Sequence, residues 1–475
     1  QALHERIDRR WLDMSVHGRG IMDENCIKQQ KYNARSLAHW GDQKTMSSMN
    51  RCGRLGVAVL TLCAVAAAHA ADVPLSAIRA GRVIDVQGGK VATDQVILVR
   101  GDRIEAVGGA STVAIPAGAK VIDLSAYTVL PGLIDTHTHI TSDPTLPPFY
   151  GYGMSVPRIA LKGAAYARKT LLAGITTIRD VGAEGYTDVA VRDAINDGEI
   201  PGPRMLVSGP ALGITGGHCD DNMLAPEFDY SAEGVADGVA GVRKAVRRNV
   251  KYGVDVIKFC GTGGVFSKGD TPGAQQYTSQ EMAALIDEAH MAGRKVAVHA
   301  HGAAGIKTAI RAGVDTVEHA SLIDDEGLQL AKKAGIYLSM DIYNSEYTQS
   351  EGPKRGELEE FLRKDREIAE AQRENFRRAV KMGIKLTFGT DAGVYPHGDN
   401  AKQLAFMVRY GMTPMQAIQA ATLNGADALG LKSVTGVIAT GLSADIIAVK
   451  RDPLEDIRAL EQVDFVMKGG EIYKQ

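Results

Sequence analysis

Cysteine, tryptophan and aromatic residues in general are scarce in this chain: its 475 residues include five cysteines and two tryptophans, and 5% are aromatic. Charge of one sign is also lacking, since the formal net charge is −2, and this gives no basic surface that would favour a nucleic-acid partner. With 45% hydrophobic residues the chain can bury a large core. We therefore expect a globular protein whose partners are small molecules.

The N-terminal region differs from the rest of the chain. Residues 1–48 are polar, lack hydrophobic periodicity and contain both tryptophans, so we predict that they form a non-structural extension. From Met49, two arginines and an apolar run over 55–68 precede Ala68-His69-Ala70, which is the pattern of a signal peptide over 49–70. The run is shorter than the ~20 residues of a spanning helix, which disfavours a stable membrane anchor. The sequence thus predicts a secreted or periplasmic protein.

Two cysteines, Cys219 and Cys260, would remain after removal of that segment. This number is too small for a disulfide-dense secreted domain. The pair could form one bridge or stay as two free thiols, and the sequence leaves both alternatives open. The fold must therefore depend on its hydrophobic core.

The two ends of the mature chain share a texture of short alternating segments punctuated by glycine. Val96–Ile104 is an example near the start, and Asp445–Val449 and Phe465–Gly470 are examples near the end. Such segments are typical of the hairpins of a small sheet. We predict that 71–128 and 432–475 together build one small β-sandwich domain.

Between 129 and 431, apolar β-type runs alternate with helical stretches, which is typical of a parallel sheet with crossover helices. The expected strands are Leu130–Ile140, Ile175–Val181, Arg204–Ser208, Val256–Cys260, Lys295–Ala300, Thr316–His319, Tyr337–Met340 and Lys385–Thr390. Eight alternations favour an α/β fold of the (β/α)₈ TIM-like barrel type. A doubly wound open sheet is the alternative, but the glycine-rich phosphate loop after its first strand is absent.

Residues of metal-binding type end five of these strands, at the edge where barrel enzymes have their active sites. His137 and His139 end the first strand, and a period of two places both imidazoles on one side. Lys258 interrupts an apolar strand, where desolvation would favour its neutral amine. A neutral amine can take up carbon dioxide, and the resulting carbamate is a suitable bridge between two metal ions.

The remaining candidates follow three later strands. His299 and His301 end the fifth strand, His319 ends the sixth, and Asp391 ends the eighth. Each of them alone would more often be a satisfied core histidine or a helix N-cap. Their recurrence at successive strand ends instead predicts one metal site, where Asp391 could bind metal and accept a proton from bound water.

The segment Pro131–His139 resembles the signature of the amidohydrolase superfamily, and the resemblance extends to Thr422–Ala426 and Gly441–Asp445. In binuclear members of that superfamily, two divalent metal ions are held at the barrel mouth. The resemblance implies the same cofactors here, with a carboxylated lysine at Lys258. The metal ligands that it implies are His137, His139, Lys258, His299, His319 and Asp391.

Within the superfamily, Val256–Lys258, Val298–Gly302 and Gly216–His218 are similar to the branch of Xaa-Pro dipeptidases and imidazolonepropionase-like proteins. The branch includes bacterial amidohydrolases that hydrolyse ochratoxin A, and many of its members are large homo-oligomers, octamers among them. The resemblance implies carboxypeptidase-like or dipeptidase-like cleavage of the amide or peptide bond to a C-terminal amino acid, with N-acyl amino acids as substrates, and a homo-oligomer.

The expected chemistry is attack by a metal-activated hydroxide, with zinc favoured by the imidazole and carboxylate ligands. Lys258 would bridge the metals, Asp391 would move the water's proton to the leaving amine, and His218 would stabilise the oxyanion. The candidates for binding the substrate are His218, His301, Arg179 and Tyr343.

Two other functions are compatible with a barrel of this kind. Cyclic-amide hydrolysis of the imidazolonepropionase or hydantoinase type uses a similar scaffold, whereas deaminases usually lack the bridging lysine, so Lys258 disfavours them. A metal-free binding protein is disfavoured because every expected ligand is present.

Overall fold

The computed structural model describes residues 73–147 and 149–475. The extension over 1–48 and the signal peptide over 49–70 lie outside these residues, so both stay predictions. Among the described helices, none is both long enough and apolar enough to cross a membrane.

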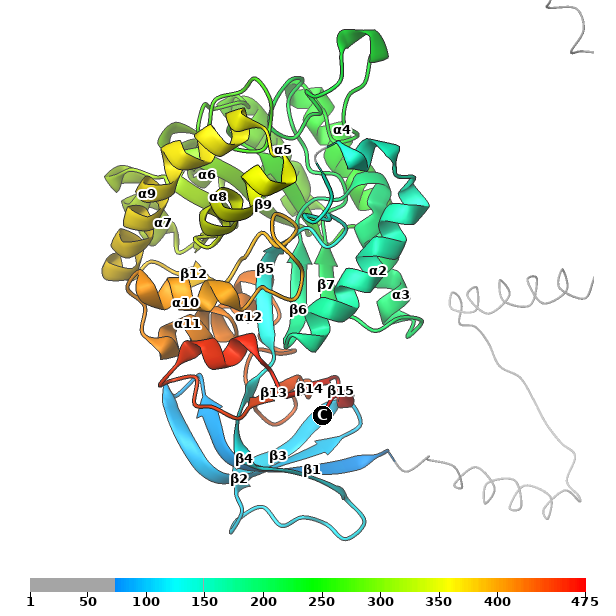
Figure 1. Ribbon diagram of the computed structural model, residues 1–475, viewed down its shortest axis with the longest axis vertical. Helices are drawn as coiled ribbons and strands as arrows, with labels where there is room; N and C mark the ends of the chain where they lie inside the picture. Colours follow the sequence, from blue (N-terminus) through cyan, green and yellow to red (C-terminus); the bar gives the residue numbers. More distant parts are fainter. Residues whose placement is uncertain (1–72, 148) are drawn as a thin grey trace, which may run out of the picture. The chain divides into compact units, whose positions relative to one another are not determined.

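Both ends of the described chain contribute to one mixed sheet of seven strands (Figure 1). Its order is β15 (Glu471–Lys474), β14 (Phe465–Lys468), β13 (Ile446–Val449), β4 (Lys120–Pro131), β1 (Leu75–Asp85), β2 (Lys90–Arg100) and β3 (Arg103–Gly109). The antiparallel pairing of β13 with β4 joins the two ends of the chain. A sandwich arrangement of this sheet, and the domain boundaries, stay predictions.

The central part of the chain forms two parallel sheets, each strand followed by helical segments. One sheet has the order β5 (Leu133–Thr138), β6 (Ile175–Asp180) and β7 (Arg204–Val207). The other has the order β12 (Leu386–Thr387), β11 (Tyr337–Ser339), β10 (Thr316–Leu322), β9 (Lys295–Gly302) and β8 (Val256–Cys260). Each strand overlaps one of the runs expected from the sequence, and the sheets confirm the parallel α/β arrangement.

Backbone hydrogen bonds connect these two sheets at both of their edges. Beyond β7, the amide of Leu212 donates to the carbonyl of Lys258 in β8 over 2.8 Å. On the opposite edge, the amide of Thr136 in β5 donates to the carbonyl of Phe388, just after β12, over 2.9 Å. The carboxyl ends of the parallel strands therefore face a common space.

Helices surround the parallel strands (Figure 1). They are α2 (Val156–Leu172), α3 (Thr187–Asn196), α4 (Gly238–Lys251), α5 (Ser279–Met291), α6 (Ala303–Ala312), α7 (Asp325–Ala334), α8 (Asn344–Arg355), α9 (Glu359–Met382), α10 (Lys402–Arg409), α11 (Pro414–Ala420) and α12 (Leu423–Leu429). A capping box fixes the start of α5. The Thr278 side chain accepts a hydrogen bond from the amide of Glu281, and the Glu281 carboxylate accepts one from the amide of Thr278.

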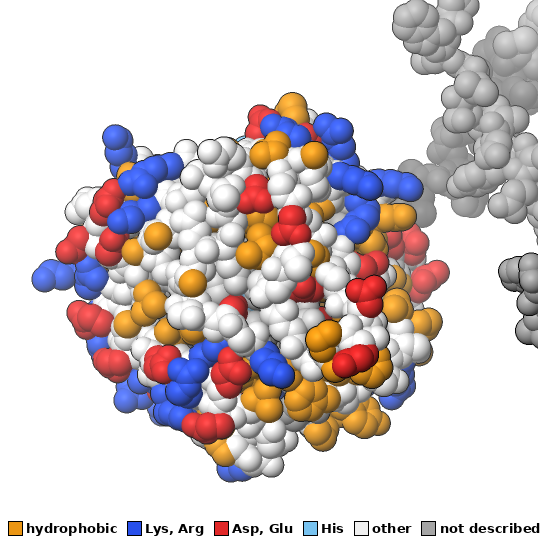
Figure 2. All heavy atoms as spheres, turned by 90° about the horizontal axis from the view of Figure 1, so that it is seen from above, with side chains coloured by type: hydrophobic (Ala, Val, Ile, Leu, Met, Phe, Trp, Pro, Cys, Tyr) orange, Lys and Arg blue, Asp and Glu red, His pale blue; other side chains and the backbone are white. Residues whose placement is uncertain are grey.

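Apolar side chains between these strands and helices form the larger core, in which Ile178, Phe259 and Val298 are fully buried. Removal of this apolar surface from water is the main favourable term for the fold. On the face of the molecule seen in Figure 2, acidic and basic side chains are interspersed, as a net charge of −2 leads one to expect.

Cys219 and Cys260 form a disulfide, with their Cα atoms 5.8 Å apart. This decides between the two alternatives that the sequence left open. The bridge joins the loop after β7 to the end of β8. It therefore holds His218, which precedes Cys219, next to the strand that carries Lys258.

Candidate active site

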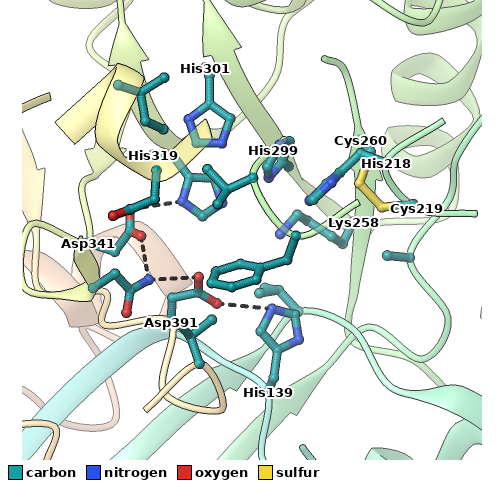
Figure 3. Close-up of a pocket in the computed structure, with 18 of the residues that line it drawn as sticks. His139, His218, Cys219, Lys258, Cys260, His299, His301, His319, Asp341 and Asp391 are labelled. Atoms are coloured by element: carbon teal, nitrogen blue, oxygen red, sulfur yellow. Dashed lines mark hydrogen bonds and ion pairs between the residues drawn. A yellow bond between two sulfur atoms is a disulfide. The ribbon is translucent and has the colours of Figure 1, made fainter. Parts of the chain in front are cut away.

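Most of the predicted site residues line one cavity of about 320 Å³ at the ends of the parallel strands (Figure 3). Those that line it are His139, His218, Lys258, His299, His301, His319 and Asp391. His137 is 1% exposed, and its ligand atom lies within 4.8 Å of those of His139 and Asp391. The structure therefore brings together, from distant parts of the chain, every residue predicted to hold a metal ion.

His137, His139 and Asp391 form one group of possible ligands. The Nε2 atom of each imidazole lies 3.3 Å from Oδ1 of Asp391, and the ligand atoms are all within 4.8 Å of one another. Asp391 has a φ of 59°, in the left-handed region that few residues other than glycine adopt. Such local strain is typical of functional positions, and here it directs the carboxylate toward the two imidazoles.

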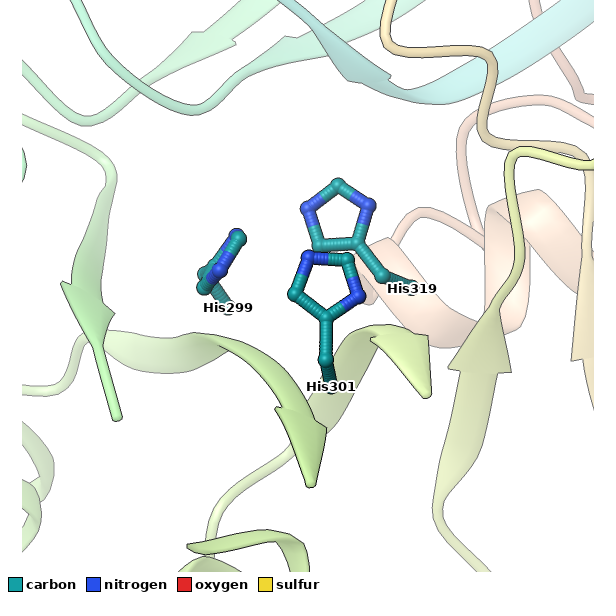
Figure 4. Close-up of side chains that lie close together, drawn as sticks. All are labelled: His299, His301 and His319. Carbon is teal, nitrogen blue, oxygen red and sulfur yellow. The ribbon is translucent and has the colours of Figure 1, made fainter. Parts of the chain in front are cut away.

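His299, His301 and His319 form a second group, again with ligand atoms within 4.8 Å of one another (Figure 4). The first two lie two residues apart on β9, so both point to the same side of the strand. His319, on β10, has a φ of 70°, and the pairing between β9 and β10 shifts register immediately after it. The three rings thus surround a single space.

Lys258 extends toward the space between these two groups (Figure 3). Its side chain is almost fully buried on β8, and burial lowers the pKa of the amine to about 8, although Glu318 and Asp391 oppose this change. A substantial fraction of the amine is therefore neutral near pH 8. This is the form that can react with carbon dioxide.

Hydrogen bonds to the second ring nitrogen orient several of these histidines. Nδ1 of His139 lies 3.0 Å from the carbonyl oxygen of Gly182, and Nδ1 of His319 lies 2.8 Å from Oδ1 of Asp341. Because Nδ1 donates in both cases, Nε2 keeps its lone pair and faces the cavity side. This is the tautomer that a metal ligand requires.

His137 is oriented in the same way by a buried charge. Its Nδ1 lies 3.0 Å from Oε2 of Glu318, whose Oε1 accepts from Nη2 of Arg179 over 2.7 Å. Burial opposes ionisation of Glu318, but Arg179 and His137 hold the pKa of this carboxyl well below its usual range. Burial and Lys258 disfavour protonation of His137, yet Asp391 and Glu318 raise its pKa to about 9.

Among the predicted metal ligands, two buried ring nitrogens, Nε2 of His137 and Nε2 of His299, have no hydrogen-bond partner. Buried polar atoms are normally paired, and an unpaired one costs about 1–3 kcal/mol. A cation bound by each nitrogen would remove that cost, and imidazole with carboxylate is a donor set that suits divalent metals such as zinc. The residues present therefore fit a metal site.

Arg179 and Tyr343 are not brought to the cavity. The guanidinium of Arg179 is 2% exposed and is directed at Glu318 and at the carbonyl of Thr136. The ring of Tyr343 packs against Tyr395, 4.9 Å between ring centroids. The substrate contacts expected of these two residues do not fit their positions, because neither side chain lines the cavity.

Asp341 and Asn344 line the cavity as well, although the sequence did not single them out. Nδ2 of Asn344 donates to Oδ2 of Asp341 over 2.6 Å and to Oδ2 of Asp391 over 2.9 Å. Asp341 directly follows the seventh expected strand, so the rule that polar residues end each strand could have found it. Asn344, at the start of α8, offered no such signal.

His218 covers one side of the second histidine group. Its ring stacks on that of His299, with 4.0 Å between centroids, and burial lowers its pKa to about 4. Val265, Phe266 and Ile368 add an apolar wall to the same cavity. The cavity thus combines a polar floor with a wall suited to an apolar group.

The chain is an enzyme that hydrolyses C–N bonds, and comparisons with known proteins show this. The model of the amidohydrolase family matches residues 128–473, and the chain belongs to that family. Members of the family generally use divalent metal ions, in agreement with the His and Asp groups of the site.

Three relatives of different kinds share most of the chain. Ochratoxinase of Aspergillus niger is 36% identical over 370 residues, which are 73% of this chain and 75% of that protein. A crystal structure of a Xaa-Pro dipeptidase with bound methionine in the active site has a TM-score of 0.79 at 37% identity, covering 84% of this chain and all of the other. Imidazolonepropionase of Alkaliphilus metalliredigens is 22% identical over 80% of this chain and 90% of that protein. The predicted resemblance is confirmed.

Proposed function

We propose that this chain is a metal-dependent amidohydrolase that cleaves the amide or peptide bond to a C-terminal amino acid. N-acyl amino acids are the proposed substrate class, ochratoxin A among them. The observation that carries the proposal is the convergence of His137, His139 and Asp391 with the second histidine group on either side of Lys258. The similarity to an ochratoxinase and to a Xaa-Pro dipeptidase supports the choice of bond.

Two divalent cations, zinc by the ligand set, would be held by His137, His139, His299, His319, Asp391 and a carboxylated Lys258. When bound, they would lower the pKa of a shared water and polarise the scissile carbonyl. His299 is preferred to His301 as a ligand because its buried Nε2 has no other partner. Nδ1 of His301 lies 2.8 Å from Oγ of Ser321, and its other nitrogen is available to the substrate.

The chain's own residues divide the remaining tasks. Asp391 would accept the proton of the attacking water at Oδ1 and later deliver it to the leaving amine. Asn344 holds the other carboxylate oxygen of Asp391 in place. The apolar wall of Val265, Phe266 and Ile368 would take up the acyl group or the amino-acid side chain and exclude water.

We also propose a closed barrel, a location outside the cytoplasm and a homo-oligomeric state. The hydrogen bonds at both edges of the parallel sheets support a closed (β/α)₈ barrel. The disulfide between Cys219 and Cys260 suits an oxidising compartment, which supports a secreted or periplasmic location. A homo-oligomer, an octamer in particular, follows from the family resemblance.

Release of free amino acids from a library of N-acyl amino acids and ochratoxin A by zinc-loaded protein tests the function. The matched control is Lys258→Ala, which removes the proposed bridge. Turnover by the wild-type protein with loss of turnover in the variant is the expected result. Hydrolysis confined to cyclic ureas and other cyclic amides would replace this proposal with the imidazolonepropionase-like alternative.

A further inference from the structure

A chain of buried hydrogen bonds leads from His218 away from the cavity. Nδ1 of His218 lies 2.7 Å from Oγ of Ser267, and Oγ of Ser267 lies 2.7 Å from Oδ1 of Asp270. The same Oδ1 accepts from Nζ of Lys364 over 2.9 Å. Lys364 is 1% exposed and Ser267 is 4% exposed, so this chain is shielded from water.

Each contact in this series of hydrogen bonds needs one hydrogen atom between its two heavy atoms. Only one placement of the available hydrogens meets that condition. The carboxylate of Asp270 can only accept, and it accepts from Lys364 as well, so the single hydrogen of Ser267 Oγ points to Asp270. Ser267 must then accept from Nδ1–H of His218. In the reverse arrangement, two acceptor oxygens would face each other at 2.7 Å with no hydrogen between them.

The surroundings hold the imidazole in this position from other directions. The amide of His218 donates to Oε1 of Gln276 over 3.0 Å, and the adjacent Cys219 is tied to β8 by the disulfide. Gly264 passes under the ring so closely that a Cβ atom there would lie 2.4 Å from Cε1 of His218. The ring therefore has little freedom to turn over and exchange its nitrogens.

We propose that Ser267, Asp270 and Lys364 hold His218 as its Nδ1–H tautomer, so that Nε2 accepts a hydrogen bond from the N–H of the bound amide. The inference rests on the proposed function for its substrate, whereas the tautomer itself follows from the hydrogen bonds alone. In this tautomer Nε2 of His218 is a hydrogen-bond acceptor. It therefore cannot donate to an oxyanion, which is the role expected from the sequence. Ser267, Asp270 and Lys364 act through His218 and are positioning residues.

The tautomer can be observed directly by NMR of zinc-loaded protein with ¹⁵N-labelled histidine, with the His218→Gln spectrum identifying the signals. We expect Nδ1 to carry the proton in the wild type, mixed tautomers in Ser267→Ala, and recovery of one tautomer in Ser267→Thr, which restores the hydroxyl. Ser350→Ala, at an exposed serine of α8, is the matched control and should change nothing. A proton on Nε2 in the wild type, or an unchanged tautomer in Ser267→Ala, would overturn the proposal.

The substrate contact has a separate readout. Wild-type protein should favour an N-acyl amino acid over its N-methyl amide analogue by roughly ten-fold in kcat/KM, which is the size expected of one hydrogen bond. Ser267→Ala should lose this preference mainly through a higher KM for the N–H substrate. An equal preference in both proteins would overturn the contact. Absence of amide hydrolysis with the expected tautomer would instead refute the proposed function and the contact while upholding the positioning by Ser267.

Discussion

Oε2 of Glu318 lies 3.0 Å from Nδ1 of His137, although 181 positions separate the two residues in the sequence. Glu318 is fully buried and is paired with Arg179 on its other side. This contact occupies Nδ1 of His137 and leaves Nε2, which makes no hydrogen bond, to face Oδ1 of Asp391 at 3.3 Å. A carboxylate that binds no metal itself thus prepares a ligand for metal binding.

Glu318→Gln should weaken metal binding. The amide keeps the shape of the side chain but removes the charge that favours Nδ1–H of His137, and loss of such a partner typically costs 10- to 100-fold, so we expect roughly that loss in zinc affinity. A competitive titration with a zinc chelator measures the change. The control is Glu326→Gln on α7, far more exposed than Glu318, and zinc affinity equal to the wild type in both variants would refute the role of Glu318.

Loss of the disulfide should destabilise the protein. Cys219 and Cys260 are 41 positions apart, and closing a loop of this length in the unfolded chain corresponds to roughly 4 kcal/mol. Urea unfolding of the wild type with and without reductant should show this difference. The Cys219→Ala/Cys260→Ala protein should be insensitive to the reductant. Wild-type stability that does not respond to reductant would contradict the prediction.

Acid should destabilise the protein partly through His397. Burial lowers the pKa of this side chain from its ordinary value of 6.5 to about 4. Between these values the unfolded chain binds a proton that the native protein does not bind, so the free energy of unfolding decreases as pH falls, by up to about 3 kcal/mol. The metal-free His397→Phe variant should show a shallower decrease than the metal-free wild type. Equal slopes in the two proteins would refute the assignment.

The sequence predicted well which side chains meet at the cavity, because their positions follow simple rules. A period of two places His137 and His139 on one side of their strand, and polar residues at the ends of parallel strands face a common space. The eighth strand was predicted less well, since Lys385–Thr390 was expected and Leu386–Thr387 was found. Beyond Thr387 the backbone still bonds to β5, through the carbonyl of Phe388 and the amide of Asp391, but Asp391 has a left-handed φ that regular strands do not adopt.

Contacts that supporting side chains make across the fold could not be predicted. Glu318 stands between Val317 and His319, and nothing in that segment shows which residue its carboxylate meets. Arg179 was predicted at a strand end, but only the folded structure shows it turned toward Glu318. The partners of Ser267 and Lys364 lie in separate loops and helices, so their meeting depends on tertiary packing.

We propose above all that two cations lie on either side of a carboxylated Lys258. Anomalous diffraction at the zinc edge, recorded from crystals of zinc-loaded protein, tests it most directly. Two peaks are predicted, one among His137, His139 and Asp391 and one beside His299 and His319, with electron density for a carboxylate on Nζ of Lys258. A single peak, or an unmodified Lys258 between two peaks, would contradict the account.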